Sequence, residues 1–117
     1  MEYPTLLLNV TIEERQIPVE TPPGMVVEAE DFFARMDADM DQGWQMSRQW
    51  VESPGTLQRC QIVADKLLMA LDGGNQTMVQ LMAAYILSRM PGVVGVRINT
   101  DGEMQETELQ MGAGAGQ

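Results

Sequence analysis

The longest apolar stretch of the chain, Asn75–Met90, predicts a buried helix. At helical spacing its apolar side chains leave almost no polar side, because few polar residues interrupt it after the first turn. A helix that is apolar nearly all round is buried in a core or against a second subunit. It is too short to span a bilayer, which requires about 20 apolar residues. Asn75 is a favoured N-cap residue, and Pro91-Gly92 predicts the end of this helix.

Two more helices are predicted before it. In Val27–Glu52, apolar residues recur at three- and four-residue spacing, which predicts one long helix with a bend or close approach at Gly43. Ser53-Pro54 is a typical helix start, and the apolar stripe that follows predicts a helix to about Asp72. Two glycines then connect this helix to the one at Asn75, so the two should pair as an antiparallel hairpin.

Alternating apolar and polar residues at both ends of the chain predict two β-hairpins. Thr5–Glu20 alternates on either side of a polar reversal at Glu13–Gln16, and Pro18 places the second strand at a sheet edge. Val93–Gln110 alternates in the same way, and Asp101-Gly102 is a strong signal for a two-residue turn. The returning strand is polar and acidic, which is typical of an exposed edge.

The order ββ-ααα-ββ predicts an α+β domain, in which the two hairpins form a small sheet packed by three central helices. We expect residues 1–111 to form a single domain, and the Gly/Ala-rich residues 112–117 to be a flexible tail. The hairpin, the Pro22-Pro23-Gly24 turn and the acidic helix that follows resemble the start of many β-grasp domains, ferredoxins included. None of a ferredoxin's cluster cysteines is present, so the resemblance implies a topology and no cofactor.

The charge of the chain narrows its possible partners. A formal charge of −10 and a pI of about 4.1 argue against contact with nucleic acid or with anionic membranes. The acidic ends of the chain flank a slightly basic middle, which indicates either a surface that keeps the protein soluble or a negative surface that attracts a basic protein partner. The opening residues do not resemble a signal peptide, and Cys60 is the single cysteine, so we expect a cytoplasmic protein.

The absence of histidine from the sequence excludes several catalytic and metal-binding classes. Ser-His-Asp and Cys-His nucleophile systems, His-ligated zinc and di-iron bundles all require it. A single cysteine also excludes an iron–sulfur cluster held within one chain, and no glycine-rich nucleotide loop occurs. We therefore expect neither a catalytic set nor a cofactor.

An acidic run within the long predicted helix is similar to the start of a calcium-binding loop. Asp37, Asp39 and Asp41 follow the D-x-D-x-D pattern, but Gln42 and Arg48 stand where such a loop needs glycine and glutamate. The helical apolar period also continues through this segment. We therefore interpret the aspartates as a solvated helix face, with weak Mg²⁺ binding at Asp37 and Asp41 as the alternative.

Sulfur-containing residues are the other candidates for chemistry. Cys60 lies on the apolar stripe of its helix, where a free cysteine behaves as a small hydrophobe; a catalytic thiol is the alternative. The chain has 11 methionines, several of them at helical spacing, which indicates core packing. An adaptable binding surface and Cu(I) binding through thioethers are the alternatives, although the methionines do not cluster in one loop.

The two tryptophans suggest an interface, since they are six positions apart on the predicted helix and their rings would point in different directions. One ring would then pack inward and the other would contact a partner, because tryptophan is enriched at binding hot spots. The alternative is that a second layer of the same domain covers the other ring. The candidate interface residues are Trp44, Trp50, Val79, Met82 and Ile86.

The leading hypothesis is a non-enzymatic, acidic protein-interaction or adaptor module that forms a homodimer through apolar helix surface. A small-molecule or metal-binding protein with a Met-lined pocket is the first alternative. The second is an acidic inhibitor that mimics nucleic acid, and an enzyme that works through carboxylates alone also remains open.

Overall fold

Within residues 5–112, which the computed structural model describes, both ends of the chain join one mixed sheet. Its order is β2-β1-β5-β6, with β1 and β5 parallel at the centre and the outer pairs antiparallel. The strands are β1 (Leu6–Ile12), β2 (Arg15–Thr21), β5 (Val93–Ile98) and β6 (Glu108–Met111). The predicted α+β class is therefore confirmed, and Pro18 lies on an edge strand as expected.

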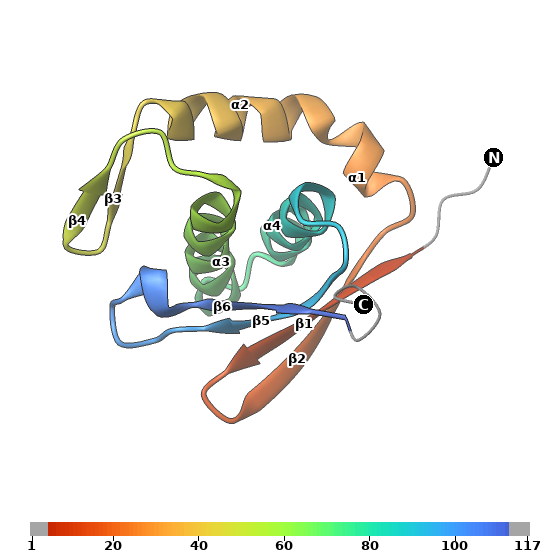
Figure 1. The fold of residues 1–117 in the computed structure, drawn as a ribbon. Helices are drawn as coiled ribbons and strands as arrows, with labels where there is room; N and C mark the ends of the chain where they lie inside the picture. Colours follow the sequence, from red (N-terminus) through yellow and green to blue (C-terminus); the bar gives the residue numbers. More distant parts are fainter. Residues whose placement is uncertain (1–4, 113–117) are drawn as a thin grey trace.

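The helices cover one face of this sheet in two layers (Figure 1). The antiparallel pair α3 (Thr56–Asp72) and α4 (Gln76–Arg89) lies next to the sheet, and α2 (Glu30–Asp41) crosses it on the far side. A single helical turn, α1 (Met25–Glu28), leads into α2. The α3–α4 pair is thus the middle layer of the domain.

The predicted central helix is confirmed as buried. In α4, Ala83, Tyr85 and Ile86 are fully buried between the sheet and the other helices. The Asn75 side chain caps the helix by accepting a hydrogen bond of 3.1 Å from the Met78 amide. Within residues 5–112, no helix is both long enough and apolar enough to cross a membrane.

The prediction of one helix over Val27–Glu52 is wrong in two places. The helix is broken at Ala29, where φ is −92° and ψ is 9°, and it ends at Asp41. A separate hairpin follows, formed by β3 (Trp44–Met46) and β4 (Gln49–Val51).

Gly43 explains why the helix stops there. Its φ of +101° is a left-handed conformation that favours glycine. A Cβ atom at this position would lie 2.4 Å from the Trp50 ring, so the ring packs directly over the glycine. The residue that seemed to mark a helix bend therefore ends the helix and supports a hairpin.

The predicted start of α3 at Ser53-Pro54 is also displaced. Ser53 has a φ of +50°, the helix begins at Thr56, and the Gly55 amide donates a hydrogen bond of 3.0 Å to the Gln58 side chain. The Pro54 carbonyl instead accepts a bond of 2.7 Å from the Arg59 guanidinium. A side chain further along the helix thus keeps Pro54 in the preceding loop.

The second hairpin pairs as predicted, but its connection is not a two-residue turn. The loop includes a 3₁₀ turn, Met104–Glu106, and the returning strand begins at Glu108. The Asn99 side chain accepts hydrogen bonds from the amides of Asp101 and Glu103, which organises the longer loop. The predicted flexible tail includes residues 113–117, which lie outside the described residues.

Candidate ligand-binding cavity beside α2

α2 presents different chemistry on its two flanks. The side of α2 that contacts the α3–α4 pair contains the two buried residues of α2, Phe33 and Met40. Acidic residues lie on the flank that faces the beginning of α3 and the end of α4, where Arg59 and Arg89 are located. The opposite flank faces the α3–α4 connection.

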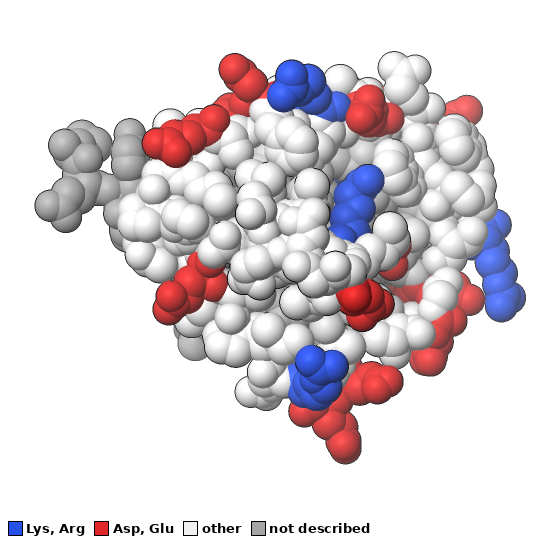
Figure 2. Space-filling view, turned by 180° about the vertical axis from the view of Figure 1, so that it is seen from behind, with Lys and Arg blue, Asp and Glu red and all other residues white. Residues whose placement is uncertain are grey.

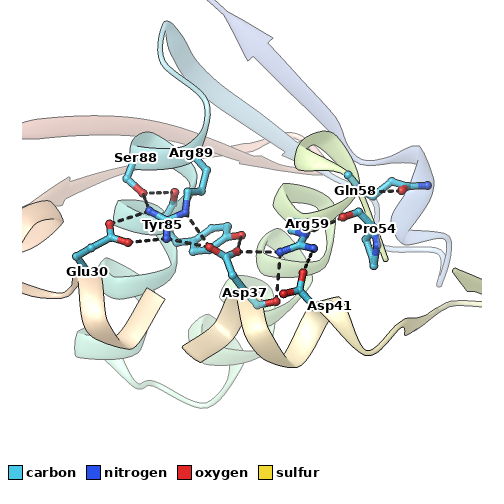
Figure 3. Close-up of polar contacts among 10 residues, drawn as sticks. Glu30, Asp37, Asp41, Pro54, Gln58, Arg59, Tyr85, Ser88 and Arg89 are labelled. Atoms are coloured by element: carbon cyan, nitrogen blue, oxygen red, sulfur yellow. Dashed lines mark hydrogen bonds and ion pairs between the residues drawn. The ribbon is translucent and has the colours of Figure 1, made fainter. Parts of the chain in front are cut away.

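The acidic flank is held by an arginine clamp, which consists of Glu30, Asp37, Asp41, Arg59 and Arg89 (Figure 3). Arg89 donates two bonds of 2.9 Å to the two carboxylate oxygens of Glu30, and a third of 2.9 Å to Asp37. Arg59 pairs with Asp37 at 3.4 Å and also with Asp41. The clamp therefore ties α2 to both helices of the middle layer.

Asp37 is the centre of the clamp. Besides both arginines, it accepts a hydrogen bond of 2.5 Å from the hydroxyl of the fully buried Tyr85. The Tyr85 ring packs edge-on against Phe33, with ring centroids 5.7 Å apart. Burial opposes ionisation of Asp37, but the bonds from Tyr85 and Arg89 outweigh it and hold the pKa of Asp37 below its ordinary value. Because these charges satisfy one another, the clamp is suited to positioning α2.

The opposite flank of α2 borders a Met-lined cavity of about 600 Å³. This volume is within the range of about 300–1,000 Å³ that is typical of small-molecule sites. The side chains come from α2, from the end of α3 and from the start of α4. The lining residues are Phe32, Met36, Asp39, Lys66, Met69, Ala70, Gly73, Asn75, Met78 and Met82.

The cavity is adjacent to a smaller hollow of about 30 Å³ that reaches Trp44. Met36, Asp39 and Lys66 line both spaces, so these three residues mark the boundary between them. The ammonium of Lys66 lies 4.7 Å from the centroid of the Trp44 ring, a cation–π contact. Within residues 5–112, neither Lys66 nor Asp39 belongs to an ion pair.

Methionines are concentrated around this cavity. Four of its ten lining residues are methionines, and leucine, isoleucine and valine do not occur among the described residues that line it. The buried core, in contrast, is mostly leucine, isoleucine and valine, with Met40, Met46 and Met82 as its methionines. Sequence reasoning missed this grouping because Met36, Met69 and Met78 lie on three different helices and meet only when those helices pack.

The expected interface residues do not form one surface. Val79, Met82 and Ile86 are at most 2% exposed, so the prediction that they offer a contact surface is corrected: they belong to the core. Trp44 is half-buried beside Lys66, whereas Trp50 is 55% exposed on the β3–β4 hairpin. Of the five candidates, Trp50 is the one that the fold leaves exposed.

The aspartates and the cysteine also have defined places. Asp39 and Asp41 are exposed, as a solvated face requires, but Asp37 is half-buried at the centre of the clamp, so the interpretation as one solvated face fails at Asp37. Among the described residues, no group of three or more His, Cys, Asp or Glu side chains is arranged to hold a metal ion. Cys60 is fully buried, and burial raises the pKa of its thiol to about 12.

Seen from behind, the molecule carries acidic side chains mainly towards its margin, while much of the centre of this face is uncharged (Figure 2).

Comparison of the chain with protein-family models, curated proteins and solved structures gave no match.

Proposed function

We propose that the protein is a non-enzymatic binding protein that holds a small apolar molecule in the Met-lined cavity. The observation that carries this proposal is the cavity itself, about 600 Å³ in volume and bordered by Phe32 and four methionines. Flexible thioether side chains adapt to guests of different shapes at little energetic cost. The proposal corresponds to the first alternative from the sequence, with a specific place for the pocket.

The charged groups near the cavity favour binding over catalysis. Among the described lining residues, Asp39 is the one carboxylate and Lys66 the one cationic side chain, whereas glycoside hydrolysis, a reaction typical of carboxylate enzymes, uses a pair of carboxylates. The other nearby charges, in the clamp, are engaged with one another. This arrangement supports recognition of a guest without a chemical step.

Binding of a neutral apolar fluorescent probe, N-phenyl-1-naphthylamine, tests the proposal. Met69 lines the cavity and is 61% exposed, so Met69→Glu should place a carboxylate at the cavity with little effect on folding. Met111, on β6, does not line the cavity and is 47% exposed, which makes Met111→Glu a matched control. We expect Met69→Glu to weaken probe binding at least about tenfold, equal to 1.4 kcal/mol.

The control should bind the probe with the affinity of the unmodified protein. Equal affinities of the two variants would place the probe elsewhere on the molecule. Failure of the unmodified protein to bind the probe at micromolar concentration would reject the cavity as an apolar binding site.

A second candidate function is the protein-interaction module expected from the sequence, and the exposed Trp50 favours it. Trp50 is on β4, and Arg48 is in the turn of the same hairpin with its side chain 91% exposed. Tryptophan and arginine are both enriched at protein interfaces. A homodimer or a basic partner bound through this hairpin is the corresponding proposal.

Sedimentation equilibrium tests the dimer. We expect added salt to strengthen association by screening the charge of −10, and Trp50→Ala to weaken association. A species of 13.0 kDa at all concentrations would contradict it.

A further inference from the structure

A second cavity, of about 380 Å³, is bordered by α3, by the turn between β3 and β4, and by the loop that follows β5. We call it the Asp65 cavity. Its volume is also within the range that is typical of small-molecule sites, and none of its described lining residues borders the Met-lined cavity. It is therefore a separate site, and what it binds does not depend on the apolar guest. The lining residues are Ser47, Asp65, Leu68, Asn99, Thr100, Gly102, Glu103 and Met104.

Hydrogen bonds between distant segments of the chain fix the walls of this cavity. The Ser47 hydroxyl accepts a bond of 2.9 Å from the Met104 amide, which joins the β3–β4 turn to the loop after β5. The side chain of Gln61, 6% exposed on α3, donates bonds of 3.0 Å to the carbonyls of Gln105 and Thr107. The loop is thus attached to both neighbours, so the cavity is formed before any guest binds, which lowers the cost of binding.

Asp65 is a carboxylate without a partner at this cavity. It is half-buried, and it forms no ion pair with any residue in the described part of the chain. Burial raises the pKa of Asp65, although the positive charge of Lys66 opposes the shift. Because folding disfavours its ionised form, Asp65 lowers the stability of the folded protein at neutral pH. A carboxylate kept in a cavity at such a cost is typical of a binding site.

We propose that the Asp65 cavity binds a small primary amine, whose ammonium group pairs with the Asp65 carboxylate. The described lining residues include no lysine or arginine that would oppose a cation. Glu103 is the second carboxylate of the lining, but Arg48 pairs with it at 3.6 Å, which leaves Asp65 as the anchor. Leu68 and Met104 provide apolar surface for a short hydrocarbon chain, and the net charge of −10 attracts cations to the protein.

Calorimetric titration with the five-carbon amine n-pentylamine tests the inference. Asp65→Asn removes the charge and keeps the shape, and it should not destabilise the fold, because the ionised carboxylate costs stability. Asp72→Asn changes the net charge equally and is the matched control, since Asp72 is exposed on the same helix and does not line the cavity. We expect saturable binding in the unmodified protein and in the control, and a loss of affinity of at least about tenfold in Asp65→Asn.

A neutral ligand of the same length makes the test independent of any variant. The alcohol n-pentanol lacks the ammonium group, so the unmodified protein should bind it at least about tenfold more weakly than the amine. Asp39→Asn should bind the amine normally, because Asp39 lines the Met-lined cavity and not this one. Equal affinities for amine and alcohol, equal binding by Asp65→Asn and the unmodified protein, loss of binding in Asp39→Asn, or no saturable binding at millimolar amine would each overturn the inference.

Two further measurements identify the guest and keep the two cavities apart. Nα-acetyl-lysine N-methylamide carries the same ammonium group on a peptide backbone. Tighter binding of n-pentylamine supports a free amine, whereas tighter binding of the lysine derivative would overturn it in favour of a lysine side chain of a protein partner. Asp65→Asn should bind N-phenyl-1-naphthylamine as the unmodified protein does, so failure of the amine site leaves the apolar site in the Met-lined cavity standing.

Discussion

The two flanks of α2 differ in how they contact the α3–α4 pair: one is held by charged hydrogen bonds and the other borders a cavity. On one flank, the arginine clamp joins α2 to α3 and α4 through short charged hydrogen bonds, and Tyr85 completes the bonding of Asp37. On the other flank, α2 stands over the Met-lined cavity, where Asp39 and Lys66 belong to no ion pair among the described residues. Residues that are neighbours in sequence, such as Met36 and Asp37, therefore have different environments.

This difference separates the residues that hold α2 from those that are free to bind. Charge-assisted hydrogen bonds are directional and set the position of α2 from one side. The opposite side is then left with a space that dispersion contacts do not fill. A helix attached in this manner keeps its place while its apolar flank remains available to a guest.

The largest expected effect comes from removing the centre of the clamp. Asp37→Ala leaves Arg59, Arg89 and Tyr85 without their shared acceptor, and we expect a loss of about 2–3 kcal/mol in the free energy of unfolding. Asp39→Ala, two residues along on the other flank, should change it by less than about 0.5 kcal/mol. Urea denaturation of the two variants provides the measurement.

Thiol labelling reports on the same comparison in the native state. Cys60 is fully buried, and the nearby Asp37 also contributes to the raised pKa of its thiol. It should react slowly in the unmodified protein and in Asp39→Ala, but faster in Asp37→Ala as α2 loosens. Equal stabilities and equal labelling rates of the two variants would show that the clamp does not hold the helix.

The next largest effect is expected from acidification, which should weaken the contribution of the arginine clamp to stability. The pKa of Asp37 is lowered in the folded state, so its contribution to stability is present above its unfolded pKa, about 3.9, and is lost as pH falls through the folded value. Between pH 7 and pH 5 the unmodified protein and Asp37→Asn should therefore keep a constant difference in stability. Below about pH 4 the difference should shrink in urea unfolding experiments. A difference that grows on acidification would contradict the assignment.

The sequence was informative wherever local pattern determines structure. The apolar stretch that became α4 was predicted almost to the residue, as were its Asn75 cap and the first hairpin. The β3–β4 hairpin was missed because its strands have three residues each, and Gly43 and Trp50 also fit a helical period. The local sequence pattern cannot show that the Trp50 ring covers the backbone of Gly43.

Neither flank of α2 was visible in the sequence, and the reason is distance along the chain. Arg89 lies 52 residues from Asp37, and Arg59 lies 22 residues from it, so the acidic residues looked like an exposed face. The cavity methionines looked like core filler for the same reason. Both features depend on how α2 crosses the α3–α4 pair, which is a property of packing.

A smaller effect is expected from the Tyr85 hydroxyl. Tyr85→Phe keeps the ring that packs on Phe33 but removes one of the donors to Asp37, while both arginines remain. We expect a loss of about 1 kcal/mol in urea denaturation, the usual value for one hydrogen bond. Binding of N-phenyl-1-naphthylamine should not change, because Tyr85 does not line the Met-lined cavity. A tenfold change in probe affinity would show that the two flanks are coupled.

The smallest effect on stability is expected at Met36, next to Asp37 on the same helix. Leucine and methionine have similar helix propensity and volume, so Met36→Leu should alter the free energy of unfolding by less than about 0.5 kcal/mol. Because Met36 borders an open space, the change in side-chain shape meets little resistance from neighbouring atoms. Urea denaturation beside Asp37→Ala gives the comparison under one set of conditions. A loss above about 1.5 kcal/mol would mean that Met36 is packed as tightly as a core residue, and the contrast between the two flanks would no longer hold.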